Sequence, residues 1–215
     1  SEEDILEIGP GKGAITSLLS QTANKVLGVE IDRTLCEFLD RKKISNLEIL
    51  NQDILKINIE KYNYKTIVGN LPYYITSPII FNFFESNSNW ENMYFLVQKE
   101  VAERIVSCPG KKSYGRLSVM TQIFSDPKIL FNVPPNVFKP IPKVDSSFIH
   151  IKKKQKKISD YKRFKEIVRM IFNKRRKKLK NCITQDMKLN IDSSSTLLDK
   201  RPEQITVDEY IKLIN

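Results

Sequence analysis

The residues with the clearest chemical potential form the string Asn70-Leu71-Pro72-Tyr73, which directly follows the strand-like run 66–69. Pro72 has no N–H and fixes its φ angle near about −65°, so the strand must end there in a turn. Such a turn places an amide side chain, a backbone carbonyl and an aromatic ring at the carboxyl end of a strand, where open α/β sheets form their ligand sites. A planar nitrogen heterocycle with an exocyclic amine needs these groups, because two acceptors take its N–H bonds and the ring stacks on it. A plain turn with a packed tyrosine fits the same four residues, so the neighbouring motifs must decide.

A second candidate site lies near the start of the chain, in the string Glu7-Ile8-Gly9-Pro10-Gly11-Lys12-Gly13-Ala14. The glycines permit a sharp turn and let a ligand approach the backbone N–H groups. The spacing also fits the dinucleotide pattern G-x-G-x-x-A, with an acidic residue about twenty positions further on. These residues alone leave three readings open: a nicotinamide-dependent oxidoreductase, a nucleoside cofactor without a pyrophosphate, and a turn that binds no ligand.

Two acidic residues favour the nucleoside cofactor. Glu30, at the end of the second strand-like run, can accept hydrogen bonds from both ribose hydroxyls through its two carboxylate oxygens. Asp53, just past the third such run, is placed to accept from an adenine amine, with Ile54 against the adenine ring. We predict that the cofactor-binding residues are Glu7, Gly9, Gly11, Gly13, Glu30, Ile31, Asp53, Ile54 and Asn70.

The elements that must position these residues alternate between strand-like and helix-like runs through the first two thirds of the chain. This alternation predicts an α/β fold whose mostly parallel sheet is sandwiched by helices, with one reversed strand near its end. The expected strands are 5–8, 25–30, 47–51, 66–70, 93–98, 129–131 and 146–151. The expected helices run from the glycine turn to about 19, over 33–43, from Pro78 onward, and over 99–107 and 116–124.

From about residue 153 the pattern becomes helical, which predicts a small all-α domain over 153–215 after a cofactor-binding domain over 1–152. Ser159 and Asp160 can cap a helix whose apolar residues follow an i, i+3, i+4 spacing. A last helix begins near 201–206. The first of these helices is expected to extend through a basic run formed by Lys174, Arg175, Arg176, Lys177 and Lys178.

The charge of the chain is concentrated in one segment. The net charge is +11, but residues 151–181 hold 15 Lys and Arg against two acids, a net +13 that leaves the other 184 residues near −2. Such a patch attracts phosphate backbones and anionic membranes. The three scattered cysteines and the single His150 match neither a disulfide framework nor a metal site. Because no signal peptide or membrane-spanning run is visible, we expect a soluble, intracellular protein.

Together these motifs resemble the KsgA family of small-subunit ribosomal RNA adenine dimethyltransferases. The resemblance runs essentially end to end. Residues 7–11 resemble the cofactor glycine motif, and residues 70–78 resemble the catalytic motif of adenine methyltransferases in this family's form. Further family signatures match residues 97–105, 114–119, 138–147 and the basic junction 172–181. The resemblance implies a Rossmann-like methyltransferase fold, S-adenosylmethionine as cofactor, and ribosomal RNA of the small-subunit precursor as partner.

The resemblance also implies the reaction, in which two adjacent adenines are each dimethylated. We expect the Asn70 side-chain oxygen and the Pro72 carbonyl to accept the two N–H bonds of the adenine amine. Tyr73 is expected to stack on the extruded base and Phe138 to cover its other face. The basic helix is expected to hold RNA phosphates rather than to read bases.

The sequence departs from the family at its start. Family members carry a Gln-Asn-Phe-Leu segment before the first strand that helps hold the cofactor, whereas this chain begins at Ser1, so we expect that segment to be missing. Three other functions stay open: a related large-subunit rRNA adenine methyltransferase, an NAD-binding oxidoreductase, and a noncatalytic ribosome assembly factor. We expect a monomer without metal or membrane partner, in the cytoplasm or in an organelle with its own ribosome.

Overall fold

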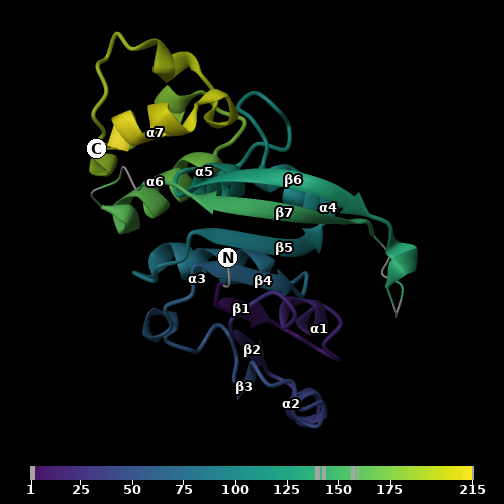
Figure 1. The fold of residues 1–215 in the computed structure, drawn as a ribbon. Coiled ribbons are helices and arrows are strands. Elements are labelled where there is room, and N and C mark those ends of the chain that lie inside the picture. The colour runs from purple at the N-terminus through teal and green to yellow at the C-terminus, as the bar shows by residue number, and fades with distance from the viewer. Residues whose placement is uncertain (1–2, 139–140, 142–143, 156–157, 159, 215) are drawn as a thin grey trace. The chain divides into compact units, whose positions relative to one another are not determined.

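The computed structural model describes residues 3–138, 141, 144–155, 158 and 160–214, and a seven-stranded sheet organises the fold (Figure 1). The strands are β1 (Ile5–Ile8), β2 (Val26–Glu30), β3 (Leu47–Asn51), β4 (Thr66–Asn70), β5 (Asn92–Gln98), β6 (Ser125–Val133) and β7 (Ser146–Lys153). Their spatial order is β3-β2-β1-β4-β5-β7-β6. Strands β1 to β5 pair in parallel, and β7 is antiparallel to β5. The predicted Rossmann-like sheet with a reversed strand is therefore confirmed.

The strand order creates a switch point between β1 and β4. The chain runs from β1 outward to β2 and β3, then returns to β4 on the other side of β1. Because these four strands are parallel, their carboxyl ends share one edge of the sheet, where such folds bind ligands. The segments that follow them are the glycine turn, residues 31–32, residues 52–54 and residues 71–73. Topology thus gathers the sequence-predicted segments at one edge.

Seven α-helices and six 3₁₀ turns connect the strands within the described part of the chain. The α-helices are α1 (Thr16–Leu19), α2 (Arg33–Asp40), α3 (Thr76–Glu85), α4 (Lys99–Ile105), α5 (Arg116–Gln122), α6 (Tyr161–Asn173) and α7 (Val207–Ile214). The 3₁₀ turns are Ile59–Lys61, Pro135–Val137, Leu179–Asn181, Gln185–Met187, Thr196–Asp199 and Pro202–Gln204. Helix α2 starts where its sequence dictates, because the Asp32 carboxylate accepts hydrogen bonds from Thr34 N and Leu35 N, at 2.8 and 3.3 Å.

The core of the sheet follows from its apolar strands. All five residues of β2 and the first four of β4 are buried, as expected for parallel strands covered on both faces. Strand β5 instead alternates between buried and half-buried residues. Trp90 is buried two residues before the start of β5, and its ring N–H donates to the carbonyl of Phe83 at 3.1 Å. This contact lies at the amino end of β5, whereas the segments gathered by the topology follow the carboxyl ends of the strands.

The chain divides into two compact units. One comprises the residues up to Ala102 together with Lys128–Lys153, and the other comprises Glu103–Pro127 with Lys154–Asn215. The second unit has its own core, in which the Tyr114 hydroxyl donates to the Ile205 carbonyl at 3.0 Å and the Tyr210 hydroxyl to the Pro202 carbonyl at 2.9 Å. One division falls after residue 153, beside the predicted domain boundary, while residues 103–127 join the second unit.

Several helix predictions need correction. Helix α1 has four residues, since residues 11–15 form turns, and α2 ends at Asp40 rather than at residue 43. Helix α3 begins two residues before Pro78. Asp160 caps α6 by accepting from Arg163 N at 3.0 Å, whereas Ser159 lies outside the described residues.

The basic run does not extend α6, so that prediction is wrong. The helix ends at Asn173, and Lys174 has φ −109° and ψ 35°, outside the helical region. Like charges three and four residues apart, as in this run, repel one another on a helix surface and so disfavour a helix. The carbonyls of Lys174 and Lys178 instead accept from the buried Cys182 thiol, at 3.6 and 3.4 Å. The run is therefore a turn that the thiol helps to hold.

Candidate active site

A cavity of about 290 Å³ lies at the carboxyl edge of the sheet. Its walls come from the ends of β1, β2 and β4, from the residues after β3, and from the start of α3. The sequence-predicted residues that line it are Gly9, Glu30, Ile31, Asp53, Ile54, Asn70 and Pro72. Gln52, Leu55 and Tyr74 also line it, although the sequence did not single them out. The fold thus joins the two predicted motifs in one cavity.

The glycine turn needs its glycines. Gly9, Gly11 and Gly13 have φ angles of +67°, +59° and +81°, a region that other residues rarely adopt. A Cβ on Gly13 would lie 2.6 Å from Cδ2 of Leu39, so α2 packs directly on the turn. Gly9 is the member of the three that lines the cavity.

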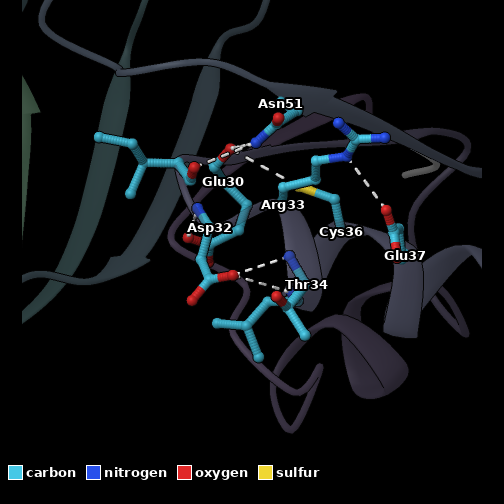
Figure 2. A network of polar contacts seen from close by, with 9 residues as sticks. Glu30, Asp32, Arg33, Thr34, Cys36, Glu37 and Asn51 are labelled. Carbon is cyan, nitrogen blue, oxygen red and sulfur yellow. Dashed lines mark hydrogen bonds and ion pairs between the residues drawn. The ribbon is translucent and has the colours of Figure 1, made fainter.

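Glu30 is held rigidly at the end of β2 (Figure 2). Its side chain is buried, and its Oε2 accepts from Gly11 N at 3.1 Å while its Oε1 accepts from Asp32 N at 3.0 Å. The Asn51 amide donates to the backbone carbonyls of Glu30 and Ile31, at 3.0 and 3.1 Å. Each carboxylate oxygen keeps a further lone pair, which suits the two hydroxyls of a ribose.

Asp53 and its neighbours, which follow β3, also line the cavity. The Asp53 Oδ1 accepts from Leu55 N at 2.9 Å, and its Oδ2 lies 4.0 Å from the Lys56 ammonium. Ile54 is buried against the cavity, while Ile31 is 69% exposed on the other side. An apolar side chain left so open beside a carboxylate is typical of a site that a flat, partly polar ligand covers.

Glu7 lies in β1 and does not line the cavity. Its side chain is 2% exposed, and its Oε2 has no hydrogen-bond partner among the described residues. Burial raises the pKa of the Glu7 carboxyl, and the nearby Thr16 hydroxyl only partly opposes this shift. The Thr16 Oγ1 has no hydrogen-bond partner within the described chain, so its opposing effect is weak. Burial therefore sets the upward direction of the pKa shift of Glu7.

Asn70 ends β4 with an exposed side chain. Within the described chain its amide makes no hydrogen bond, so its donors and its acceptor are unused in a residue that lines the cavity. The Pro72 carbonyl differs from its prediction, because it already accepts from Ile75 N at 3.1 Å and from the Thr76 hydroxyl at 3.3 Å. Both of its lone pairs serve the first turn of α3. The neighbouring Leu71 carbonyl accepts no hydrogen bond from any described residue.

The two tyrosines of the turn differ in their surroundings. Tyr73 is half-buried and lies outside the cavity lining, and its hydroxyl is hydrogen-bonded to the Ser146 hydroxyl at 2.9 Å. Tyr74 lines the cavity and is 84% exposed. The sequence could not show which of two adjacent tyrosines faces the cavity, because the local turn geometry sets this.

The comparison with protein families identifies the chain. The sequence model of the family described as ribosomal RNA adenine dimethylase matches residues 1–215. The chain belongs to this family. It is accordingly a methyltransferase, and a pyridine-nucleotide oxidoreductase is excluded.

Curated relatives of this chain carry the description ribosomal RNA small subunit methyltransferase A. The protein from Mycoplasma capricolum is 43% identical over 98% of this chain and 85% of its own length. Those from Francisella tularensis subsp. novicida and Lachnoclostridium phytofermentans are 40% and 39% identical, over 98% and 97% of this chain and 85% and 80% of their own lengths.

Solved structures agree with the fold of the dimethylase. A dimethyladenosine transferase from Plasmodium falciparum superposes with a TM-score of 0.86 over 99% of this chain and 88% of that chain, at 24% identity. The 23S rRNA methyltransferase ErmE superposes with a TM-score of 0.74 over 99% and 91% of the two chains, at 25% identity.

The loop that carries Phe138 is described in part. Phe138 is half-buried, follows the 3₁₀ turn Pro135–Val137, and does not line the cavity. Lys139, Pro140, Pro142 and Lys143 of the same family signature lie outside the described residues. The far end of the signature is Ser146 and Ser147, both fully buried at the start of β7.

The basic turn surrounds a second, open cavity of about 530 Å³ lined by Lys174, Arg175, Arg176 and Lys177 with two asparagines. Arg175 is engaged by Glu203 and by the Lys112 carbonyl.

Lys178 lies outside this lining, and its ammonium is 3.0 Å from an Asp199 oxygen that it shares with Lys180. Arg176 and Lys177 are exposed and have no described partner. The five predicted RNA-binding residues therefore differ in how free their charges are.

Among the described residues, no group of three or more His, Cys, Asp or Glu side chains is arranged to hold a metal ion. None of the helices in the described part combines the length and the apolar character needed to cross a membrane.

Proposed function

We propose that this protein transfers methyl groups from S-adenosylmethionine to the exocyclic amines of two adjacent adenines in small-subunit ribosomal RNA, giving dimethyladenosines during ribosome assembly. The observation that carries the proposal is the unused Asn70 amide at the rim of the cavity that the glycine turn and Glu30 also form. The relatives named as small subunit methyltransferase A support the choice of RNA.

The residues of the cavity fit S-adenosylmethionine. Glu30 would accept from the ribose hydroxyls, Asp53 from the adenine amine, and Ile31 and Ile54 would contact the adenine ring. Gly9 lets the cofactor approach the backbone of the turn, since a Cβ there would point towards the Asn70 carbonyl at 3.8 Å. When bound, S-adenosylmethionine would supply an electrophilic methyl group on a positively charged sulfur.

The amine of adenine is a weak nucleophile because its lone pair is delocalised into the ring. We propose that the Asn70 Oδ1 accepts one N–H bond and that the Leu71 carbonyl, rather than that of Pro72, accepts the other. Two fixed acceptors pull the nitrogen towards a tetrahedral shape and aim its lone pair at the methyl group. The residues therefore act by position and electrostatics, without a side-chain base. The methylated nitrogen would then lose a proton to water. Because the monomethylated amine keeps a single N–H, only one of the two acceptors would be engaged in the second transfer.

The catalytic role of the remaining residues stays a proposal. Tyr73 would stack on the extruded adenine and Phe138 would cover its other face. Glu7, Gly11 and Gly13 would act on the cofactor through the shape of the glycine turn, since none of them lines the cavity.

Methyl transfer to small ribosomal subunits that lack the modification tests the proposal. We expect the wild-type protein to transfer labelled methyl groups, and Asn70→Ala to lose about 10²- to 10³-fold in turnover while its affinity for S-adenosylmethionine stays within about twofold. Near-normal turnover in Asn70→Ala contradicts the assignment. Absence of transfer by the wild-type protein contradicts the function and favours a noncatalytic assembly factor.

A large-subunit substrate is the second candidate, because ErmE shares the fold at 25% identity. The same assay with large subunits separates the two.

We infer that the protein acts as a monomer wherever small subunits are assembled, in a bacterial cytoplasm or an organelle with its own ribosomes.

A further inference from the structure

We propose that Ser146 is a positioning residue for the reaction, and that it acts by fixing the ring of Tyr73. The proposal rests on the proposed function, in which the Tyr73 ring stacks on the target adenine. Its structural basis is the hydrogen bond between the two hydroxyls, 2.9 Å long, which joins the turn after β4 to the first residue of β7.

Ser146 is a firm anchor. It is fully buried and pairs with Gln98 in the antiparallel ladder between β5 and β7. The residues on either side of it are held as well. The Asp145 carbonyl accepts from Lys99 N at 3.0 Å, and the Ser147 hydroxyl donates to Asn132 Oδ1 at 2.7 Å. The backbone that carries the Ser146 hydroxyl is therefore held in place by β5 and β6, the two strands bonded to this end of β7.

Tyr73 is the less buried partner of the pair. It sits three residues after Asn70, in a turn that leaves the sheet and enters α3. A half-buried tyrosine whose hydroxyl is free can rotate about two side-chain torsions. The Ser146 bond holds the far end of the ring, while the turn holds its near end. Because Asn70 and Tyr73 share one turn, fixing the ring also fixes the plane on which a base would lie relative to the Asn70 amide.

This arrangement explains why the sheet carries a serine at a fully buried position. A buried hydroxyl without a partner is costly, so Ser146 without Tyr73 would be a poor choice for the core. The adjacent Ser147 is equally buried, but it is satisfied by Asn132 and does not contact the turn. The two serines therefore form a natural pair of test and control.

The experiment measures methyl transfer to unmodified small subunits by Tyr73→Phe, Ser146→Ala, the double variant, and the control Ser147→Ala. Loss of the hydrogen bond should lower kcat about 3- to 10-fold in each single variant, with the dissociation constant for S-adenosylmethionine unchanged within about twofold. The double variant should lose no more kcat than the more strongly affected single variant, because both changes remove the same interaction. Ser147→Ala should keep the wild-type kcat even where it lowers the thermal midpoint.

Three results would overturn the proposal: a wild-type kcat in Ser146→Ala, losses that multiply in the double variant, or an equal loss of kcat in Ser147→Ala. A second readout does not depend on turnover. In protein labelled with ¹³C at the tyrosine ζ carbon, Tyr73→Phe assigns the Tyr73 resonance, and Ser146→Ala should shift it while Ser147→Ala should not. Inactivity of the wild-type protein in the transfer assay, beside a normal shift, would mark failure of the proposed function rather than of the contact.

Discussion

Two polar side chains that line the cavity differ in whether the fold already supplies their hydrogen-bond partners. The Asn70 amide has no described partner, while both oxygens of Glu30 are held by backbone N–H groups. The first is free to bind the reacting amine, and the second is fixed before any ligand arrives. Preorganisation of this kind lowers the cost of orienting groups at the moment of reaction.

Glu7 supports a prediction about stability. Burial raises its pKa above 4.5, so the folded state prefers the protonated carboxyl. The stability that this preference adds is fully present below the pKa of the unfolded chain and is lost as the pH rises through the higher pKa of the folded state. Glu7→Gln cannot ionise. We therefore expect its thermal midpoint to exceed that of the wild type at pH 8 and to converge with it as the pH falls towards 4.5.

Thermal scans between these pH values check this, with the exposed Glu103→Gln as a control that should follow the wild type throughout. A constant difference between Glu7→Gln and wild type at all pH values would contradict the assignment to Glu7 ionisation.

At the scale of elements, six of the seven strands were predicted to within two residues at each end, whereas β6 (Ser125–Val133) extends well beyond the predicted 129–131 and several helix ends also differ. The runs of β1, β3 and β4 coincide with their predictions because apolar periodicity is local. The fate of the basic run depends on Cys182 and on Glu203, which lies 28 positions beyond Arg175. The residue pattern within the run carries no information about partners so distant in sequence.

The same limit applies to the site. Parallel topology brought the predicted segments to one edge, and the sequence could establish that. It could not show that the Pro72 carbonyl is used by α3, that Tyr74 lines the cavity, or that Tyr73 contacts Ser146, 73 positions away. These facts depend on torsion angles inside one turn and on tertiary packing.

The packing of α2 on the glycine turn gives a prediction at this scale. A Cβ in Gly13→Ala would lie 2.6 Å from Cδ2 of the fully buried Leu39, which would have to shift within the core, whereas a Cβ on Gly11 has nothing within 4 Å. Both glycines have positive φ, so both variants carry backbone strain. We expect Gly13→Ala to lose about 1–3 kcal/mol more free energy of unfolding than Gly11→Ala. Urea titration of the two variants measures the difference, and equal losses would show that Leu39 does not hold the turn.

At the scale of the whole molecule, positive charge is concentrated in one segment of the chain. Residues 151–181 carry a net +13, while the rest of the chain is close to neutral. A protein that neutralises RNA phosphates releases counterions, so its affinity falls with salt in proportion to the number of phosphates contacted. The structure adds that not every cation of the basic turn is equally available.

This difference predicts which charges set the salt dependence. The side-chain charges of Arg176 and Lys177 have no ion-pair or hydrogen-bond partner among the described residues, whereas the ammonium groups of Lys178 and Lys180 share the Asp199 carboxylate. Two double alanine variants, one for each pair, remove the same charge. The Arg176/Lys177 variant should lower the slope of log affinity against log salt by about 1.4–1.8, since each lost phosphate contact contributes roughly 0.7–0.9. The Lys178/Lys180 variant should lower it by less than half as much, because Asp199 already neutralises part of that charge. Binding to small subunits between about 50 and 200 mM salt measures both slopes. Equal reductions would mean that net charge alone attracts the RNA, and that the pairing with Asp199 has no bearing on how the basic turn binds it.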